Sequence, residues 1–212
     1  MKKSILLILI LVSLSCQGQK TWWGEYSVFT GGGKNDIFRF DELVGAPSFT
    51  GKGYWSAGID FRRIITDHFS IETGIGYSHH YYVMKSAPVP EQTTTPGNFG
   101  MVTFPVTARV DFLKYLFADA GIVAGFQAGS SHADNMSGLG LTLGLGIQYT
   151  FKSDIFVAAR ALATQQALVH FLPEDYPQTL WTSGFALSMG YQFIRLGRCN
   201  CPDDRSPRRR VF

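Results

Sequence analysis

Large apolar residues recur at every second position through 139–151, where the sequence reads LGLTLGLGIQYTF. The positions between them hold only glycine, threonine and glutamine. Such strict alternation predicts a β-strand with one apolar face and one small, polar face. Because glycine weakens a strand, we expect the small face to lie where space is short.

The same alternation recurs along the chain and predicts seven further strands. Five of them are regular and cover residues 54–63, 69–83, 101–112, 116–128 and 180–194. Two are less regular and cover residues 22–30 and 155–169. A total of about eight strands is an even number, as closed bacterial outer-membrane barrels require.

The connections between these strands alternate between short and long. The short ones are ITDH, LKY and KSD, at residues 65–68, 113–115 and 152–154. The long, polar ones cover residues 31–52, 85–98, 129–136 and 170–178. Outer-membrane barrels have short periplasmic turns and long external loops, whereas a Greek-key sandwich has no reason to alternate in this way. The pattern therefore predicts an all-β fold, an eight-stranded antiparallel up-and-down transmembrane β-barrel.

Aromatic residues on the apolar faces gather at the ends of the predicted strands. Those near the long loops are Trp55, Tyr81 and Trp181. Those near the short turns are Phe69, Phe112, Phe151, Tyr191 and Phe193. Two aromatic girdles of this kind flank the apolar band of a membrane barrel.

Charged residues of both signs fall on the polar faces and are expected in the lumen. They are Glu25, Asp60, Arg62, Glu72, Arg109, Asp111, Asp119 and Arg160. The interior of an eight-stranded barrel is just wide enough for side chains to fill. We therefore expect a network of ion pairs that closes the lumen, in which Arg109 and Arg160 neutralise some of the carboxylates.

The two ends of the chain differ in composition from the predicted barrel. Residues 1–18 combine Lys2 and Lys3 with an apolar run too short to span a bilayer as a helix, which predicts a cleaved secretory signal peptide. A lipoprotein acylated at Cys16 is the alternative. We expect residues 19–195 to form the barrel and residues 196–212 to form a periplasmic tail.

Composition and charge narrow the function classes. Only 17% of residues are charged and 14% are aromatic, which is lean in charge and rich in rings for a soluble domain. The net charge of +3 is small and much of it lies in the sequence RSPRRRVF at the C-terminus, so the predicted barrel gives no sign of nucleic-acid binding. No later segment resembles a membrane helix, so a membrane location requires a closed barrel.

The tail carries two cysteines, Cys199 and Cys201, in the sequence RCNCP. In the oxidising periplasm they are expected to form an intramolecular or intermolecular disulfide. A metal site would need two more ligands, and none is near in sequence, so we expect neither a metal nor a cofactor. The tail could serve to dock a periplasmic partner or an anionic surface.

Three stretches resemble the small outer-membrane β-barrel proteins abundant in Bacteroidota, a group that includes the PorT-like proteins. These are VTFPVTARVDF, LFADAGIVAGF and the closing SMGYQFI. The resemblance implies an outer-membrane location among lipid and lipopolysaccharide, and a last strand read by the barrel-assembly machinery through Gly190, Tyr191 and Phe193. It fixes no activity, and it departs from this chain at the tail, because such barrels often stop at the final aromatic residue.

Few residues suggest catalytic chemistry. His79 and His80 are neighbours, but alternation places them on opposite faces, which argues against a shared metal. The loop residues Ser130–Asp134 contain Ser and His without the His-x-Ser strand pattern of lipid A deacylases.

We therefore predict a non-enzymatic barrel with a structural or interaction role, for instance as an accessory to an envelope or secretion complex. A lipid-modifying enzyme such as a lipid A deacylase is the alternative. Pro105, in mid-strand, is expected at a bulge or at the external rim.

Overall fold

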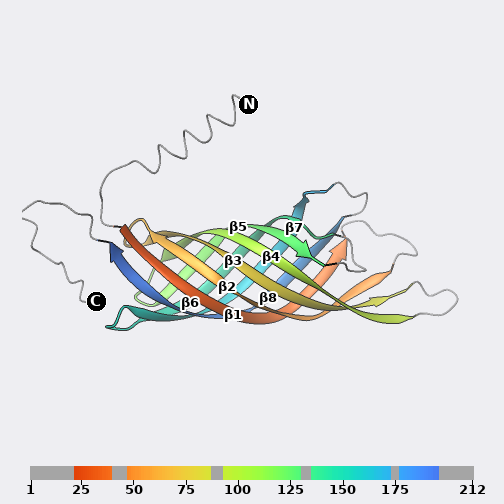
Figure 1. Cartoon of the computed structure of the whole chain (residues 1–212), viewed down its shortest axis with the longest axis horizontal. Helices are drawn as coiled ribbons and strands as arrows, with labels where there is room; N and C mark the ends of the chain where they lie inside the picture. The colour runs from red at the N-terminus through yellow and green to blue at the C-terminus, as the bar shows by residue number, and fades with distance from the viewer. Residues whose placement is uncertain (1–21, 40–46, 87–92, 130–134, 173–176, 196–212) are drawn as a thin grey trace, which may run out of the picture.

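A computed structural model describes residues 22–39, 47–86, 93–129, 135–172 and 177–195 of the chain. These residues form a closed barrel in which each strand pairs antiparallel with the next and the first pairs with the last (Figure 1). The strands are β1 (Trp22–Arg39), β2 (Ser48–Ile64), β3 (Phe69–Lys85), β4 (Thr94–Asp111), β5 (Leu116–Ala128), β6 (Gly138–Thr150), β7 (Ile155–His170) and β8 (Gln178–Arg195). The predicted fold class, an eight-stranded up-and-down barrel, is confirmed.

Alternation along each strand sorts side chains between the outside and the inside of the barrel. In β6 the leucines at 139, 141, 143 and 145 point outward and are 40–61% exposed. The intervening glycines face the lumen, where they leave room for larger side chains. A Cβ atom on Gly144 would lie 2.6 Å from both carboxylate oxygens of Asp119, and one on Gly146 would overlap the Phe117 ring. The small face of this strand therefore lies where space is short, as expected.

The two ends of the barrel differ. The three short turns, at 65–68, 112–115 and 151–154, lie at the same end as the start of β1 and the finish of β8, where Trp22 pairs with Arg195 (Figure 1). We call this the short-turn end. At the opposite end, the loop end, β1 to β4 extend well past the shorter β5 and β6.

The predicted extents of the first two long loops are wrong. β1 continues to Arg39, β2 begins at Ser48 and β4 begins at Thr94, so strand replaces much of 31–52 and 85–98. In this extension the pattern is inverted, since Lys34 and Asp36 are exposed on the outer face while Ile37 is buried inside. Above a membrane the outer face of a barrel meets water, so nothing requires it to be apolar.

Pro105 also departs from expectation. It lies in the middle of β4, pairs with Val123 of β5 and shows no shift in register. On its other side the pairing with β3 is interrupted between Thr73↔Val106 and Gly76↔Thr103. Proline has no N–H to donate, so the ladder loses bonds on one side without a bulge.

Among the described residues there is no helix long and apolar enough to cross a membrane.

Candidate functional site

The lumen near the short-turn end is crossed by a closed ring of polar side chains from four strands. Arg62 of β2 contacts Glu25 of β1 at 2.5 Å and Asp111 of β4 at 3.7 Å. Arg109, also on β4, contacts the same Asp111 at 2.9 Å and donates a hydrogen bond of 2.8 Å to Gln148 Oε1 of β6. Gln148 Nε2 in turn donates to Glu25 Oε2 at 3.5 Å, which closes the ring.

Arg160 of β7 is the centre of a second cluster of charged side chains, whose acidic members come from β2, β3 and β5. Its guanidinium lies 2.9 Å from Glu72 of β3, 3.7 Å from Asp119 of β5 and 3.9 Å from Asp60 of β2. All three carboxylate side chains are at least seven-eighths buried. We call this group the Arg160 cluster, and it joins strands on opposite sides of the barrel.

The structure thus brings together all eight charged residues that the sequence assigned to the lumen. Five carboxyl groups face three guanidiniums, so the acidic side chains of the network outnumber the basic ones. Arg109 also lies flat against an aromatic ring, with its Cζ atom 3.4 Å from the centre of Phe117. This contact adds a cation–π attraction in a desolvated setting.

Little free space remains between these side chains. The cavity lined by Glu25, Asp60, Arg62, Glu72, Arg109 and Arg160 has a volume of about 20 Å³. A volume of this size holds on the order of one water molecule. The charged part of the lumen is therefore packed shut.

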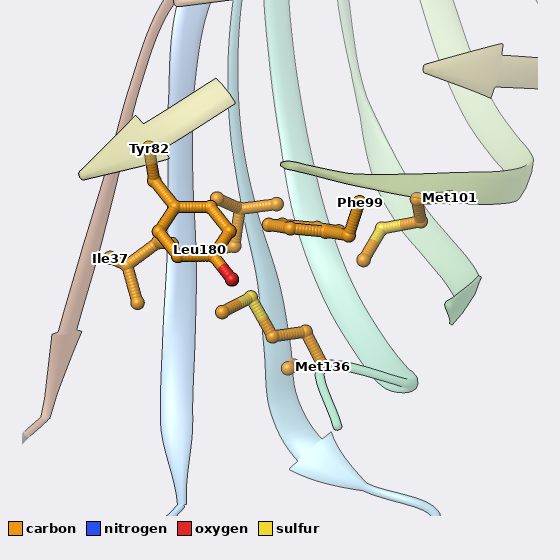
Figure 2. Packing of buried hydrophobic residues seen from close by; sticks show 7 residues of the cluster. Ile37, Tyr82, Phe99, Met101, Met136 and Leu180 are labelled. Atoms are coloured by element: carbon orange, nitrogen blue, oxygen red, sulfur yellow. The ribbon is translucent and has the colours of Figure 1, made fainter. Parts of the chain in front are cut away.

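The loop end of the lumen is closed differently, by an apolar cluster that we call the plug. It consists of Ile37, Tyr82, Phe99, Met101, Met136, Ala167 and Leu180, each at most 5% exposed (Figure 2). These residues come from strands around the barrel wall and from the connection before β6. The barrel therefore has an apolar core at its loop end and a charged core nearer its short-turn end.

Local hydrogen bonds hold Met136 in the plug. Its N–H donates to Gln127 Oε1 at 2.8 Å, and the Gln127 N–H donates to Ser137 Oγ at 2.9 Å. The Ser137 N–H donates to Asn135 Oδ1 at 2.9 Å. On the other side, Ala167 adopts a left-handed conformation with φ of 58°, next to a register shift between β6 and β7. This bulge turns a residue inward that simple alternation would not place there.

The two neighbouring histidines occupy opposite faces of β3, as alternation predicted. His80 is 1% exposed and stacks between Tyr54 and Phe99, with ring centroids 5.2 and 5.0 Å away. His79 lies outward, between Trp55 and Tyr81. Within the described residues, no group of three or more His, Cys, Asp or Glu side chains is arranged to hold a metal ion.

One pair with catalytic residue types was missed. Ser78 Oγ lies 2.9 Å from His80 Nε2 inside the barrel. The sequence carries this pair as Ser-x-His on one strand face, which is the reverse of the His-x-Ser order of lipid A deacylases. The Nδ1 atom of His80 has no hydrogen-bond partner in the described part of the chain, so no carboxylate orients the ring there.

The role of Gln148 and the plug could not be predicted from the sequence, for different reasons. Gln148 was visible as an inward position of β6, but only the structure shows that it completes the ring. The plug was hidden, because its residues alternate in the opposite sense to the membrane-facing part.

The predicted assembly residues lie together at the end of β8. Gly190 faces inward, where a Cβ atom would lie 2.6 Å from the Phe156 ring. Tyr191 points outward and is 53% exposed, and Phe193 stacks on Tyr26 with ring centroids 5.1 Å apart.

Residues 1–21 and 196–212 lie outside the described residues, and with them the predicted signal peptide, Cys16, Cys199 and Cys201. The predicted Ser130–Asp134 candidate lies outside them as well.

The sequence matches the family described as outer membrane protein beta-barrel domain over residues 4–193. This match covers most of the chain. The protein belongs to this outer-membrane β-barrel family. It is an outer-membrane protein, which agrees with its closed barrel and its outward leucines. No curated protein matches the chain.

Solved barrels share the fold at low sequence identity. The crystal structure of OprG from Pseudomonas aeruginosa superposes with a TM-score of 0.50 at 10% identity, over 82% of this chain and 95% of that one. The N-terminal barrel domain of Pseudomonas aeruginosa OprF gives a TM-score of 0.41 at 18% identity, over 84% and 100% of the two chains. Ail of Yersinia pestis, in complex with a heparin analogue, gives 0.43 at 14% identity, over 80% and 99%. At such identities the likeness to OprG shows the fold alone.

Proposed function

We propose that this protein is a closed, non-conducting barrel that holds a structured external extension above the outer membrane for interaction. The observation that carries the proposal is the ring of Glu25, Arg62, Asp111, Arg109 and Gln148, which crosses the lumen from strand to strand. The plug blocks the other end of the same passage. A solute would have to break both to cross.

Planar-bilayer recording tests this proposal directly. The purified barrel should give no large, stable conductance, while a porin reconstituted in the same lipid serves as the positive control. A steady current of porin size from the wild-type protein would refute the closed lumen. A plug variant such as Met136→Gly should also stay silent, because the charged ring remains in place beneath it.

The extension is the part of the barrel best suited to meet a partner. It presents polar outer positions such as Lys34 and Asp36 on a sheet whose inner face packs against the plug. The resemblance to PorT-like proteins supports an accessory role in an envelope or secretion complex, with lipopolysaccharide as a neighbour in the outer leaflet. The barrel-assembly machinery would read the end of β8, and the tail at 196–212 would dock a periplasmic partner.

In-cell crosslinking of the full chain and of a chain ending at Arg195 tests docking by the tail. Loss of a periplasmic adduct on truncation supports docking by the tail, and persistence of the adduct contradicts it.

A lipid-modifying enzyme is the second candidate, and the hydrogen bond between Ser78 and His80 favours it. A serine next to a histidine base is the arrangement that activates a hydroxyl for acyl transfer. Both side chains are buried inside the barrel, so a lipid would need a route to them. Lipid A and phospholipid profiles of cells carrying the wild-type protein or Ser78→Ala decide the matter. Identical profiles with and without the protein would rule out the enzyme.

A further inference from the structure

The charged side chains of the lumen divide into two groups with a different balance of acids and bases. The ring contains two acids and two guanidiniums, which are those of Glu25, Asp111, Arg62 and Arg109. The Arg160 cluster contains three acids and one guanidinium. The ring is therefore balanced by its own members, and the Arg160 cluster is not.

The guanidiniums of the ring do not make up the difference. Within the described part of the chain, every ion pair of Arg62 and Arg109 is with a member of the ring. The charged groups that face the lumen here are Glu25 of β1, Asp60 and Arg62 of β2, Glu72 of β3, Arg109 and Asp111 of β4, Asp119 of β5 and Arg160 of β7, with the neutral Gln148 of β6 and Ser188 of β8 beside them.

Arg160 contacts its three acids unequally. It donates a hydrogen bond of 2.9 Å to Glu72 Oε1, a charge-assisted contact that favours an ionised carboxylate. Its nitrogen atoms lie 3.7 Å from Asp119 Oδ2 and 3.9 Å from Asp60 Oδ2, which is beyond hydrogen-bond distance. Two buried acids are thus left with a weak share of one positive charge.

Register adds a difference between these two aspartates. Asp119 pairs with Arg109 of β4, so a second guanidinium-bearing residue stands beside it on the wall. Asp60 pairs with Ser27 of β1 and Gly74 of β3, which carry no charge. Asp60 also has the longest contact to Arg160, so it is the acid with the least compensation.

An unused acceptor in the cluster gives independent evidence that a donor belongs there. The Asp119 side chain is 3% exposed, and its Oδ2 atom accepts no hydrogen bond within the described residues. A buried acceptor without a donor is costly, because water no longer solvates it. The cavity among these side chains measures about 20 Å³, which leaves room for on the order of one water molecule. A proton occupies no volume and turns a carboxylate into a donor, so it fits this crowded site.

We propose that the Arg160 cluster binds one proton at neutral pH and that Asp60 holds it. The proton comes from bulk water and adds to a carboxylate oxygen of Asp60, and it returns to water when the pH rises. Three carboxylates around a single guanidinium repel one another in a desolvated site, and protonation of one of them relieves that repulsion. The site belongs to the barrel wall itself and is independent of any partner at the extension.

Infrared spectroscopy of the folded barrel in lipid vesicles detects such a proton directly. A protonated carboxyl group has a C=O stretching band that lies apart from the carboxylate bands. The wild type should show this band at about pH 7, where free aspartate is ionised, and should lose it as the pH is raised. Asp60→Asn should lack the band. Asp154→Asn, the same substitution in an exposed short turn, is the matched control and should keep it.

Stability against unfolding gives a second measurement with a defined sign. Unfolding at neutral pH exposes an ionised Asp60 and releases the proton, so raising the pH should favour the unfolded chain. Asp60→Asn keeps a neutral group at this position at every pH. The ratio of the wild-type unfolding constant to that of Asp60→Asn should therefore rise by up to about tenfold per pH unit between about pH 6 and pH 8. The ratio of wild type to Asp154→Asn should stay level.

Three results would overturn the proposal. They are a wild-type spectrum without the band, a band that persists in Asp60→Asn, and a ratio of unfolding constants that does not change over this pH range. Heat-dependent mobility on gels identifies any variant that fails to fold. Asp60→Ser then takes the place of Asp60→Asn, and the wild-type spectrum still decides by itself whether a proton is bound.

Discussion

Replacing Arg160 by methionine should destabilise the barrel strongly, because three buried carboxylates share this one guanidinium. The N–O distances to Glu72, Asp119 and Asp60 are 2.9, 3.7 and 3.9 Å. At an effective dielectric constant of about 20, each pair contributes roughly 4–6 kcal/mol of Coulomb attraction before desolvation is subtracted. Desolvation and repulsion among the carboxylates offset much of that sum. Removing one partner of a buried pair costs about 3–5 kcal/mol in net terms, and we expect Arg160→Met to fall in this range.

The matched control removes the whole cluster. The variant Arg160→Met/Asp60→Asn/Glu72→Gln/Asp119→Asn keeps the volume and deletes every charge, so it should recover most of the lost stability. Urea titration of the folded barrel in lipid vesicles, followed by tryptophan fluorescence, measures the free energy of unfolding of each variant. If the quadruple variant is as unstable as Arg160→Met alone, uncompensated charge is not the cause and the ion-pair interpretation fails.

Three further predictions concern the lipid face, the lumen and the topology. Leu143→Arg should cost about 2–4 kcal/mol or block insertion if this leucine lies near the midplane, whereas Leu143→Ile should be mild; equal assembly of both in a vesicle-folding assay would show that the assigned facing is wrong. Gly144→Val should slow or prevent folding because its Cβ would lie 2.6 Å from the Asp119 carboxylate oxygens, and normal folding yield would contradict the tight fit. In a background without native cysteines, Thr94→Cys should react with an impermeant thiol reagent on intact cells, and Ser153→Cys only after the outer membrane is opened. Labelling of the Ser153→Cys variant on intact cells would show that the short turns face outward and that the proposed orientation is wrong.

Alternation along the chain was sufficient to predict the part of the fold that lies in lipid. In the membrane, lipid contacts one face of the barrel wall and closely packed side chains contact the other. A leucine at a given position therefore indicates the lipid face, and a glycine indicates the lumen face. The inward placement of Glu25 and Arg160 followed from the same logic, even in the two irregular strands.

Beyond the membrane that logic no longer applies. Ile37 and Leu180 point inward there, while Lys34 is exposed on the outer face, so the sequence pattern is that of a polar loop. The partners within the lumen were equally out of reach, because they depend on the stagger between strands. Nothing in the sequence shows that Arg160 meets acids from β2, β3 and β5, or that Gln148 links Arg109 to Glu25.

The seam between β1 and β8 has a consequence for how the chain folds. All 18 residues of β1 pair with β8, which makes the longest ladder of the barrel from its two most distant segments. Until β8 has paired with it, β1 therefore has an unpaired edge, and such an edge invites aggregation. Contacts of such high sequence separation also form slowly, because the loop entropy must be lost before they bring any stabilisation. The barrel therefore closes only when its first and last strands meet, and any condition that keeps the edge of β1 from pairing with other chains before then should raise the folding yield.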